Sequence, residues 1–330
     1  MIAQTTSSVN APSQAFNLVG PIQNFTLAAG GILSGGTITV NGVTVQIPTN
    51  TVVTMPTGFL TVNQIFRGTT QGAVPAVNSG LALNDPAAVR RPGGFQVEIV
   101  GNTMESGSTR NYYAGLVRIS PDALQTSDGF IRKIDYVAGE LCVGANATPL
   151  LAAPCPATDT KVRLNDPTGK FGLLQASPDR RFTVDTENAT VTANTGYPMC
   201  IPRVAPPTVD ANCPIGNRPV NLLVQFVTTF AMNGLDYPGA GIQPFIRSCN
   251  NIPNIGGSPT TATRCAPTKQ APLVVGDYIS FQGILTSNVP GSFVSAFSIV
   301  ANVGIFTQKY AENIAAPVST SEHRRNYVKF

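Results

Sequence analysis

The sequence predicts an all-β protein made of two related small β-barrel units. The chain contains 31 glycines and 27 prolines, spread without a period, and they separate many short apolar runs. Short apolar runs between turn-forming residues are typical of strands joined by tight turns. A chain of 330 residues is also long enough to bury two separate cores.

A spaced pattern of small residues occurs twice and indicates that the two units are related. In both copies the intervals are 7, 13 and 3 residues: Gly94, Gly101, Ala114 and Val117 in the first copy, and Gly276, Gly283, Ala296 and Ile299 in the second. Residues between the two glycines of each copy alternate toward apolar types, which is typical of a strand with one buried face. We interpret each copy as a strand, a loop and a returning strand.

The chain divides on this basis into four segments. We expect a flexible polar arm at 1–15, a first β-unit at 16–124, a second and longer β-unit at 125–308, and a polar tail or linker at 309–330. Within the first unit, the segment Ile38-Thr-Val-Asn-Gly-Val-Thr-Val-Gln-Ile47 predicts a β-hairpin, because Asn-Gly suits a tight turn with positive φ at both positions. The segment 61–67 predicts a helical turn.

The hairpin, the glycines and the returning strands together resemble an OB-like small-barrel domain. The residues that carry the resemblance are Asn41-Gly42 in the first unit, and Val275-Gly-Asp-Tyr-Ile279, Gly283 and Ala296 in the second. Such domains recur in secreted bacterial and fungal proteins of unknown function. The resemblance covers about a third of the chain and leaves out 55–93 and 145–270. It implies an OB-like fold for both units, with no established activity to transfer.

The cysteines predict a disulfide-stapled second unit in an oxidising compartment. All six follow residue 141 and form three near pairs separated by 13, 13 and 16 positions. Each pair brackets a loop-like segment, and a loop of this size stabilises the fold by about 3 kcal/mol when it is closed. The predicted disulfides are Cys142–Cys155, Cys200–Cys213 and Cys249–Cys265. The chain has no CxxC and only one histidine, His323, which argues against zinc.

Other features also favour an extracellular protein. Disulfides persist outside the reducing cytosol, and three Asn-x-Thr sequons, at Asn24, Asn146 and Asn188, predict glycosylation. The chain contains no run of 18 apolar residues, so we expect no membrane span. Its net charge is +4 and its basic pairs are dispersed, whereas a nucleic-acid site concentrates them. We therefore expect a secreted protein with no nucleic-acid partner.

The sequence contains no residue pattern that predicts a catalytic site. A Ser-His-Asp arrangement needs a rigidly held histidine, and His323 lies in the polar tail. Asp185 and Glu187 stand two apart at an expected strand end, hence on one face. Such a pair suits acid–base chemistry or Ca²⁺, although ordinary solvated carboxylates explain it too. We predict no cofactor other than this possible calcium.

Aromatic residues predict a binding surface. One of the neighbours Tyr112 and Tyr113 must face outward on a strand, and Glu98 is a candidate carboxylate beside it. We expect a secreted, non-catalytic β-protein with a structural, adhesive or self-assembling role, whose partner is itself or the extracellular matrix. The alternative is an extracellular glycan-binding module or a carbohydrate-active enzyme that uses a tyrosine and carboxylate groove.

Overall fold

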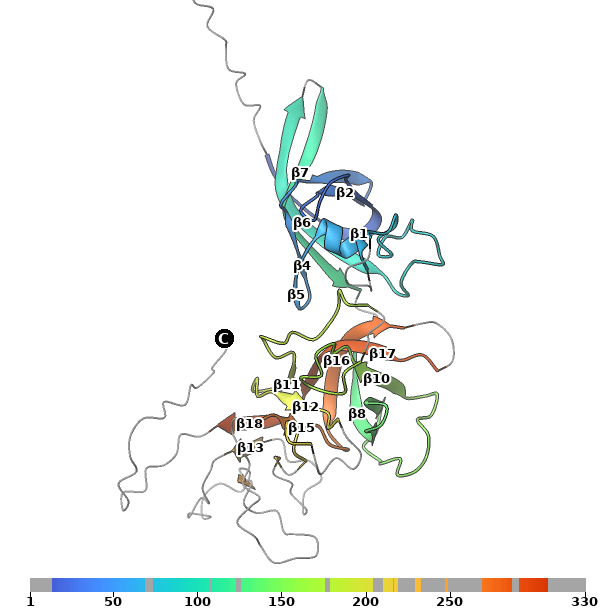
Figure 1. The fold of residues 1–330 in the computed structure, drawn as a ribbon, viewed down its shortest axis with the longest axis vertical. Helices are drawn as coiled ribbons and strands as arrows, with labels where there is room; N and C mark the ends of the chain where they lie inside the picture. Colours follow the sequence, from blue (N-terminus) through green and yellow to red (C-terminus); the bar gives the residue numbers. More distant parts are fainter. Residues whose placement is uncertain are drawn as a thin grey trace, which may run out of the picture. The chain divides into compact units, whose positions relative to one another are not determined.

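The structure forms two compact units (Figure 1). It is a computed structural model that describes residues 14–68, 74–106, 108–122, 126–175, 179–203, 210–215, 217–218, 229–232, 247–248, 269–286 and 291–307. Unit 1 comprises residues up to 125 together with 178–182 and 284–288, and unit 2 comprises the rest. Most of the predicted N-terminal arm and the whole C-terminal tail lie outside the described residues.

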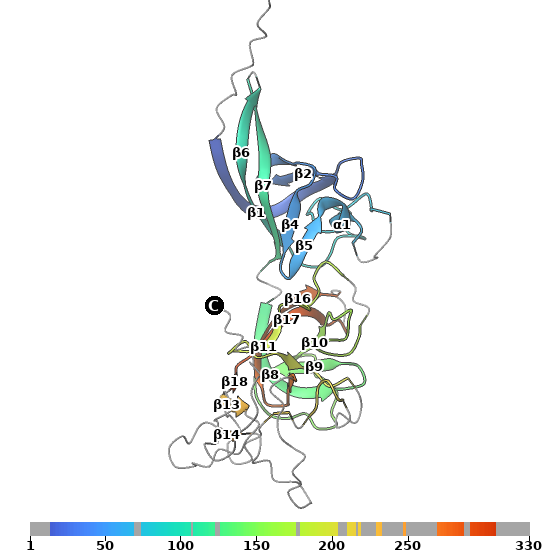
Figure 2. The same ribbon diagram turned by 60° about the vertical axis from the view of Figure 1, so that its left-hand side comes forward.

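Unit 1 contains a closed five-stranded barrel. Its elements are β1 (Gln14–Leu27), β2 (Gly36–Val40), β3 (Val43–Ile47), β4 (Val52–Met55), β5 (Gly58–Thr61), α1 (Val62–Phe66), β6 (Phe95–Ser106) and β7 (Thr109–Pro121). The strand order is β3-β2-β1-β6-β7, and a parallel pairing of β3 with β7 closes the ring. Strands β4 and β5 continue the sheet outward from β7 (Figure 2).

The predicted hairpin is confirmed as β2 and β3. Its turn residues Asn41 and Gly42 have φ of 49° and 77°, the left-handed region that Asn-Gly tolerates. Ile38 and Val45 pair across the hairpin and are fully buried, whereas Thr39 and Thr44 on the other side join their hydroxyls at 3.0 Å. One face of the hairpin therefore belongs to the barrel core.

The predicted helical turn is confirmed as α1. Thr61 accepts the backbone N–H of Gln64, and the Gln64 side chain accepts the backbone N–H of Thr61, which together form a capping box. Phe66 is buried and meets the ring of Phe25 edge to face, with centroids 5.1 Å apart. Local capping and this core contact together explain why so short a helix forms.

Residues 178–182 complete unit 1 from a distant part of the sequence. Phe182 is fully buried and its ring lies 5.3 Å from that of Phe95. The Arg181 guanidinium donates to both carboxylate oxygens of Asp179, at 2.9 and 2.7 Å, and to the carbonyls of Ile65 and Ser79. A segment far along the sequence thus supplies a core ring and a buried ion pair to unit 1.

Unit 2 follows the same strand order. Its strands are β8 (Thr126–Asp135), β9 (Glu140–Gly144), β10 (Thr160–Leu164), β11 (Val191–Ala193), β12 (Met199–Cys200), β13 (Thr229–Met232), β14 (Arg247–Ser248), β15 (Ala271–Pro272), β16 (Tyr278–Leu285), β17 (Val294–Ala301) and β18 (Gly304–Thr307). Its largest sheet runs β10-β9-β8-β16-β17-β11, and β10 also pairs with β17 in parallel. The cyclic order therefore matches that of unit 1. The predicted all-β architecture is confirmed, and the common origin of the two units stays a prediction.

Two disulfides confirm that unit 2 is the stapled one. They join Cys142 to Cys155 and Cys200 to Cys213, as the spacing predicts. The third predicted pair, Cys249 with Cys265, lies outside the described residues. In the part of the chain that the structure describes, no helix is long and apolar enough to cross a membrane.

Glycines of the repeated pattern lie where strands come very close. A Cβ built on Gly101 of β6 would lie 2.0 Å from the carbonyl oxygen of Tyr113 on β7. A Cβ on Gly283 of β16 would lie 2.6 Å from the carbonyl oxygen of Ser295 on β17. Both distances are too short for any side chain, so each glycine is required by the close approach of the strand that follows it.

We expect Gly101→Ala to destabilise the protein by about 3 kcal/mol, because the new methyl group overlaps a backbone oxygen that cannot move alone. Gly115→Ala is the matched control on β7, since its Cβ would make only one ordinary contact, 3.5 Å from the Val100 carbonyl. We expect the control to change stability by less than about 0.5 kcal/mol. Urea unfolding of both variants tests this, and equal midpoints would contradict the packing argument.

The buried ion pair also predicts acid sensitivity. Burial alone would raise the pKa of Asp179, but the ion pairs with Arg181 and Arg91 and their hydrogen bonds outweigh it and hold the pKa below its ordinary value. A carboxyl whose pKa is lower in the folded state stabilises the fold above its unfolded pKa of about 3.9. That contribution is lost as the pH falls through the folded value.

We therefore expect Asp179→Asn to lower the urea midpoint strongly at neutral pH, where it leaves the Arg181 charge buried without its partner. The difference in urea midpoint between the variant and the unchanged protein should shrink as the pH falls below about 4. Glu105→Gln, which removes an exposed ion pair with Arg110, should have little effect at any pH. If the urea midpoint of Asp179→Asn differed from that of the unchanged protein by the same amount at every pH, an ionised Asp179 would not be the source of the stability.

Candidate functional site

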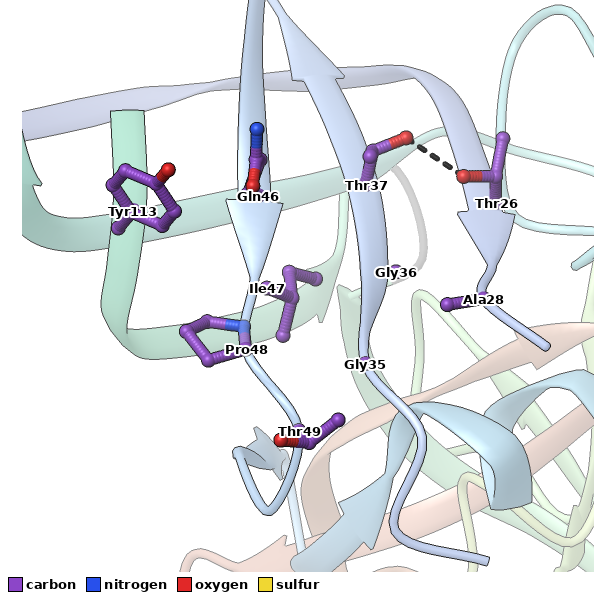
Figure 3. Close-up of a pocket in the computed structure, with 10 residues that line it drawn as sticks. All are labelled: Thr26, Ala28, Gly35, Gly36, Thr37, Gln46, Ile47, Pro48, Thr49 and Tyr113. Atoms are coloured by element: carbon purple, nitrogen blue, oxygen red, sulfur yellow. Dashed lines mark hydrogen bonds between the residues drawn. The ribbon is translucent and has the colours of Figure 1, made fainter. Parts of the chain in front are cut away.

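An open groove of about 400 Å³ lies on the surface of the first barrel (Figure 3). Its walls come from the end of β1, the start of β2, the end of β3 and one side chain of β7. The lining residues are Thr26, Ala28, Gly35, Gly36, Thr37, Gln46, Ile47, Pro48, Thr49 and Tyr113. The groove is the candidate functional site of the chain.

The strand pairing that closes the barrel places Tyr113 at the groove. Gln46 of β3 is the register partner of Tyr113 on β7, so the amide and the ring lie side by side. The neighbouring Tyr112 projects to the opposite face, where its ring meets Phe16 edge to face at 5.2 Å. The two adjacent tyrosines therefore have different roles, as strand alternation predicts.

Two glycines keep one wall of the groove close to the backbone. A Cβ on Gly35 would lie 2.0 Å from the carbonyl oxygen of Ile47, and one on Gly36 would lie 2.0 Å from that of Thr26. The hydroxyls of Thr26 and Thr37 bond to each other at 2.7 Å across β1 and β2 (Figure 3). The wall thus presents backbone and paired hydroxyls instead of bulky side chains.

The chemistry of the groove is uncharged throughout. Its ten lining residues offer three threonine hydroxyls, one amide, one phenol and the apolar surfaces of Ala28, Ile47 and Pro48. Such a mixture of an aromatic ring with neutral donors and acceptors suits a neutral ligand that carries hydroxyl or amide groups. A phosphate or another strong anion would find no cationic side chain among these ten.

Glu98 does not reach this groove. Its carboxylate accepts a bond from Arg118 at 3.0 Å, across β6 and β7. The register partner of Tyr113 is Asn102, four positions further along β6, so Glu98 lies about 13 Å away along the strand. The structure therefore brings Tyr113 to the site, while Tyr112 and Glu98 belong to other contacts.

The carboxylate of Asp185 closes a turn. One of its oxygens accepts the backbone N–H groups of Glu187 and Asn188, each at 2.8 Å, and the other accepts the Asn188 side-chain amide at 3.0 Å. Among the described residues, neither Asp185 nor Glu187 belongs to a cluster of three potential metal ligands. The calcium site at these two residues stays a prediction.

One cluster of potential ligands does occur, beside the first disulfide. The sulfurs of Cys142 and Cys155 and a carboxylate oxygen of Asp159 lie within 4.8 Å of one another. The two sulfurs form a disulfide bond with each other, whereas a metal ion is bound by free thiolates. Asp159 also accepts a bond from Arg132 at 2.7 Å. The cluster is therefore a disulfide beside an ion pair.

The three sequon asparagines are exposed at their predicted positions. Asn24 lies on β1, and Asn146 and Asn188 lie in loops. The side chain of Asn146 accepts the backbone N–H of Thr148 at 3.1 Å. Exposure is compatible with glycosylation, which stays a prediction at all three residues.

Comparison with protein-family models, curated proteins and solved structures finds no match to this chain. The resemblance to OB-like domains of secreted proteins therefore stays a prediction, although the barrel itself is shown. Most of the groove residues were missed by the sequence analysis, which considered the tyrosines and not the loop ends. The Gly35-Gly36 pair before an alternating strand is the signal that could have indicated a close approach of strands there.

The two disulfides should differ in their access to reductant. Cys200 and Cys213 are both fully buried, whereas Cys155 is half-buried. We expect limited treatment with a small thiol reductant to release Cys142 and Cys155 first, because the reductant must reach a sulfur to attack it. Alkylation of the released thiols followed by peptide mass spectrometry measures the order. Earlier labelling of Cys200 and Cys213 would contradict this prediction.

Proposed function

We propose that this chain is a secreted, non-catalytic β-protein with a structural or adhesive role, and that its groove holds a neutral glycan. The observation that carries the proposal is the groove itself, where one tyrosine ring lies among uncharged hydrogen-bonding groups. Sugars offer hydroxyl groups to such side chains and apolar ring faces to an aromatic surface. Small barrels of OB type are known to bind oligosaccharides.

The composition of the groove favours binding over hydrolysis. Glycosidases commonly need two carboxyl groups on either side of the scissile bond, and the ten lining residues include neither Asp nor Glu. The carboxylate that the sequence analysis named as a candidate beside the tyrosines, Glu98, is paired with Arg118. The proposed role is therefore retention of a glycan without chemical change.

The disulfides support the proposed extracellular location. Two of them staple the described part of unit 2, and disulfides persist in secreted proteins and are rare in the cytosol. In the extracellular space the chain would meet neutral polysaccharides and matrix components directly. These are the partners that an uncharged groove suits.

A glycan array with the intact protein, followed by affinity measurement on the best ligand, tests the proposal. We expect Tyr113→Ala to weaken binding at least about tenfold, because the ring is the largest apolar surface in the groove. Tyr113→Phe should keep most of the affinity, since it retains that ring. Tyr112→Ala is the matched control on the same strand and should keep glycan affinity while losing about 1 kcal/mol of stability with the Phe16 contact. Absence of binding to any neutral glycan would refute the proposal.

A further inference from the structure

The outer side of the unit 1 sheet carries a continuous row of side chains across five strands. Figure 2 shows the strands β5, β4, β7, β6 and β1 in this order. The register joins one residue of each strand to the next: Phe59, Thr54, Arg118, Glu98 and Val19. Register partners lie about 5 Å apart at their Cβ atoms and point to the same face. Residues of the opposite face, including Val53 and Val117, are fully buried in the core. The row therefore lies on the outside of the unit.

Large apolar side chains gather on this outer face. Phe59 is 71% exposed and Val19 is 54% exposed. A second row beside the first contains Val52, Leu116 and Val100, exposed by 48%, 38% and 37%. Leu116 and Val100 are register partners, and Val52 lies two residues before Thr54 and hence beside Leu116. We call these five apolar residues and the Arg118–Glu98 pair the outer face.

Such a grouping differs from the single exposed apolar residues found on any protein surface. Scattered residues need no explanation, whereas a contiguous apolar patch on a folded protein marks a contact surface. Strands β7, β6 and β1 belong to the closed barrel, so the outer face curves around it. A partner on the outer face would remove from water the apolar side chains nearest to the Arg118–Glu98 pair.

The two charges of the outer face are complementary to themselves under a two-fold rotation. Arg118 and Glu98 form one ion pair at 3.0 Å, with side chains 55% and 34% exposed, so the face has one positive and one negative group. A two-fold rotation places Glu98 of one copy opposite Arg118 of the other, and the reverse. A uniformly acidic or basic partner would instead set one of its charges against a like charge.

We propose that the outer face binds a second copy of this chain in a two-fold symmetric dimer. The proposal rests on the structural role put forward above and names its partner as the chain itself. None of the ten groove-lining residues belongs to the outer face, so glycan binding and dimer formation can be tested separately. The face is small for a specific interface, and the dimer therefore dissociates on dilution.

Sedimentation velocity of the whole protein, from low micromolar to several hundred micromolar, tests the inference. We expect the mass to rise with concentration from that of one chain to twice that value. Phe59→Ser should raise the dimer dissociation constant at least about tenfold, since it removes the most exposed ring of the face. Val77→Ser is the matched control, because Val77 is 92% exposed but lies in a loop and not on a strand of the outer face. It should leave the dimer unchanged.

Charge reversal separates a contact between copies from the ion pair within one copy. Glu98→Arg makes the face wholly positive and Arg118→Glu makes it wholly negative, so each variant alone should remain monomeric by like-charge repulsion. An equal mixture of the two should form heterodimers, because each copy then meets the opposite charges. Thermal unfolding of each variant checks that it is folded, as expected for exposed positions.

Three results would overturn the inference. These are a monomer at every concentration, a dimer that Phe59→Ser leaves unchanged, and charge variants that fail to associate when mixed. A series of ever larger species would equally contradict a closed two-fold contact. If the protein stays monomeric while Tyr113→Ala still abolishes glycan retention, the dimer fails and the proposed glycan binding stands. If the dimer forms and no glycan binds, the proposed glycan binding fails and the dimer stands.

Discussion

The parallel pairing of the third and fifth barrel strands is the constraint on which each unit depends. In unit 1 it joins Val45 and Gln46 to Tyr112 and Tyr113, and in unit 2 it joins β10 to β17. Without it each sheet would be open, with two exposed edges. The same pairing sets Tyr113 beside Gln46 and so forms one wall of the groove. The candidate site is thus a consequence of how the barrel closes.

The two units use the same strand order with different interior chemistry. At matching positions of the repeated pattern, Phe95 of unit 1 packs against Phe182, whereas Asp277 of unit 2 forms a buried ion pair with Arg218 at 2.6 Å. Ring packing stabilises by burial of apolar area, while a buried ion pair must offset the desolvation of both charges. The same strand order is therefore compatible with a packed pair of rings or with a buried ion pair at this position.

Low charge connects the proposed functions of the two surfaces. Only 12% of residues are charged, and several of the described ones are engaged with each other, as in Arg181 with Asp179 and Arg118 with Glu98. The groove is left with neutral hydrogen-bonding groups, and the outer face with apolar side chains around a single ion pair. A neutral ligand and a second copy of the chain are the partners that such surfaces match.

The sequence alone determined the features that depend on neighbours in the chain. Asn41-Gly42 specified the hairpin because its conformational preference is local, and two disulfides followed from cysteines 13 residues apart. Only the tertiary structure decided that Tyr113 lines a groove, that Glu98 pairs with Arg118, and that Phe182 returns to the first core. These contacts join segments that are distant in the sequence. Strand register decides which side chains meet, and a local sequence pattern does not contain the register.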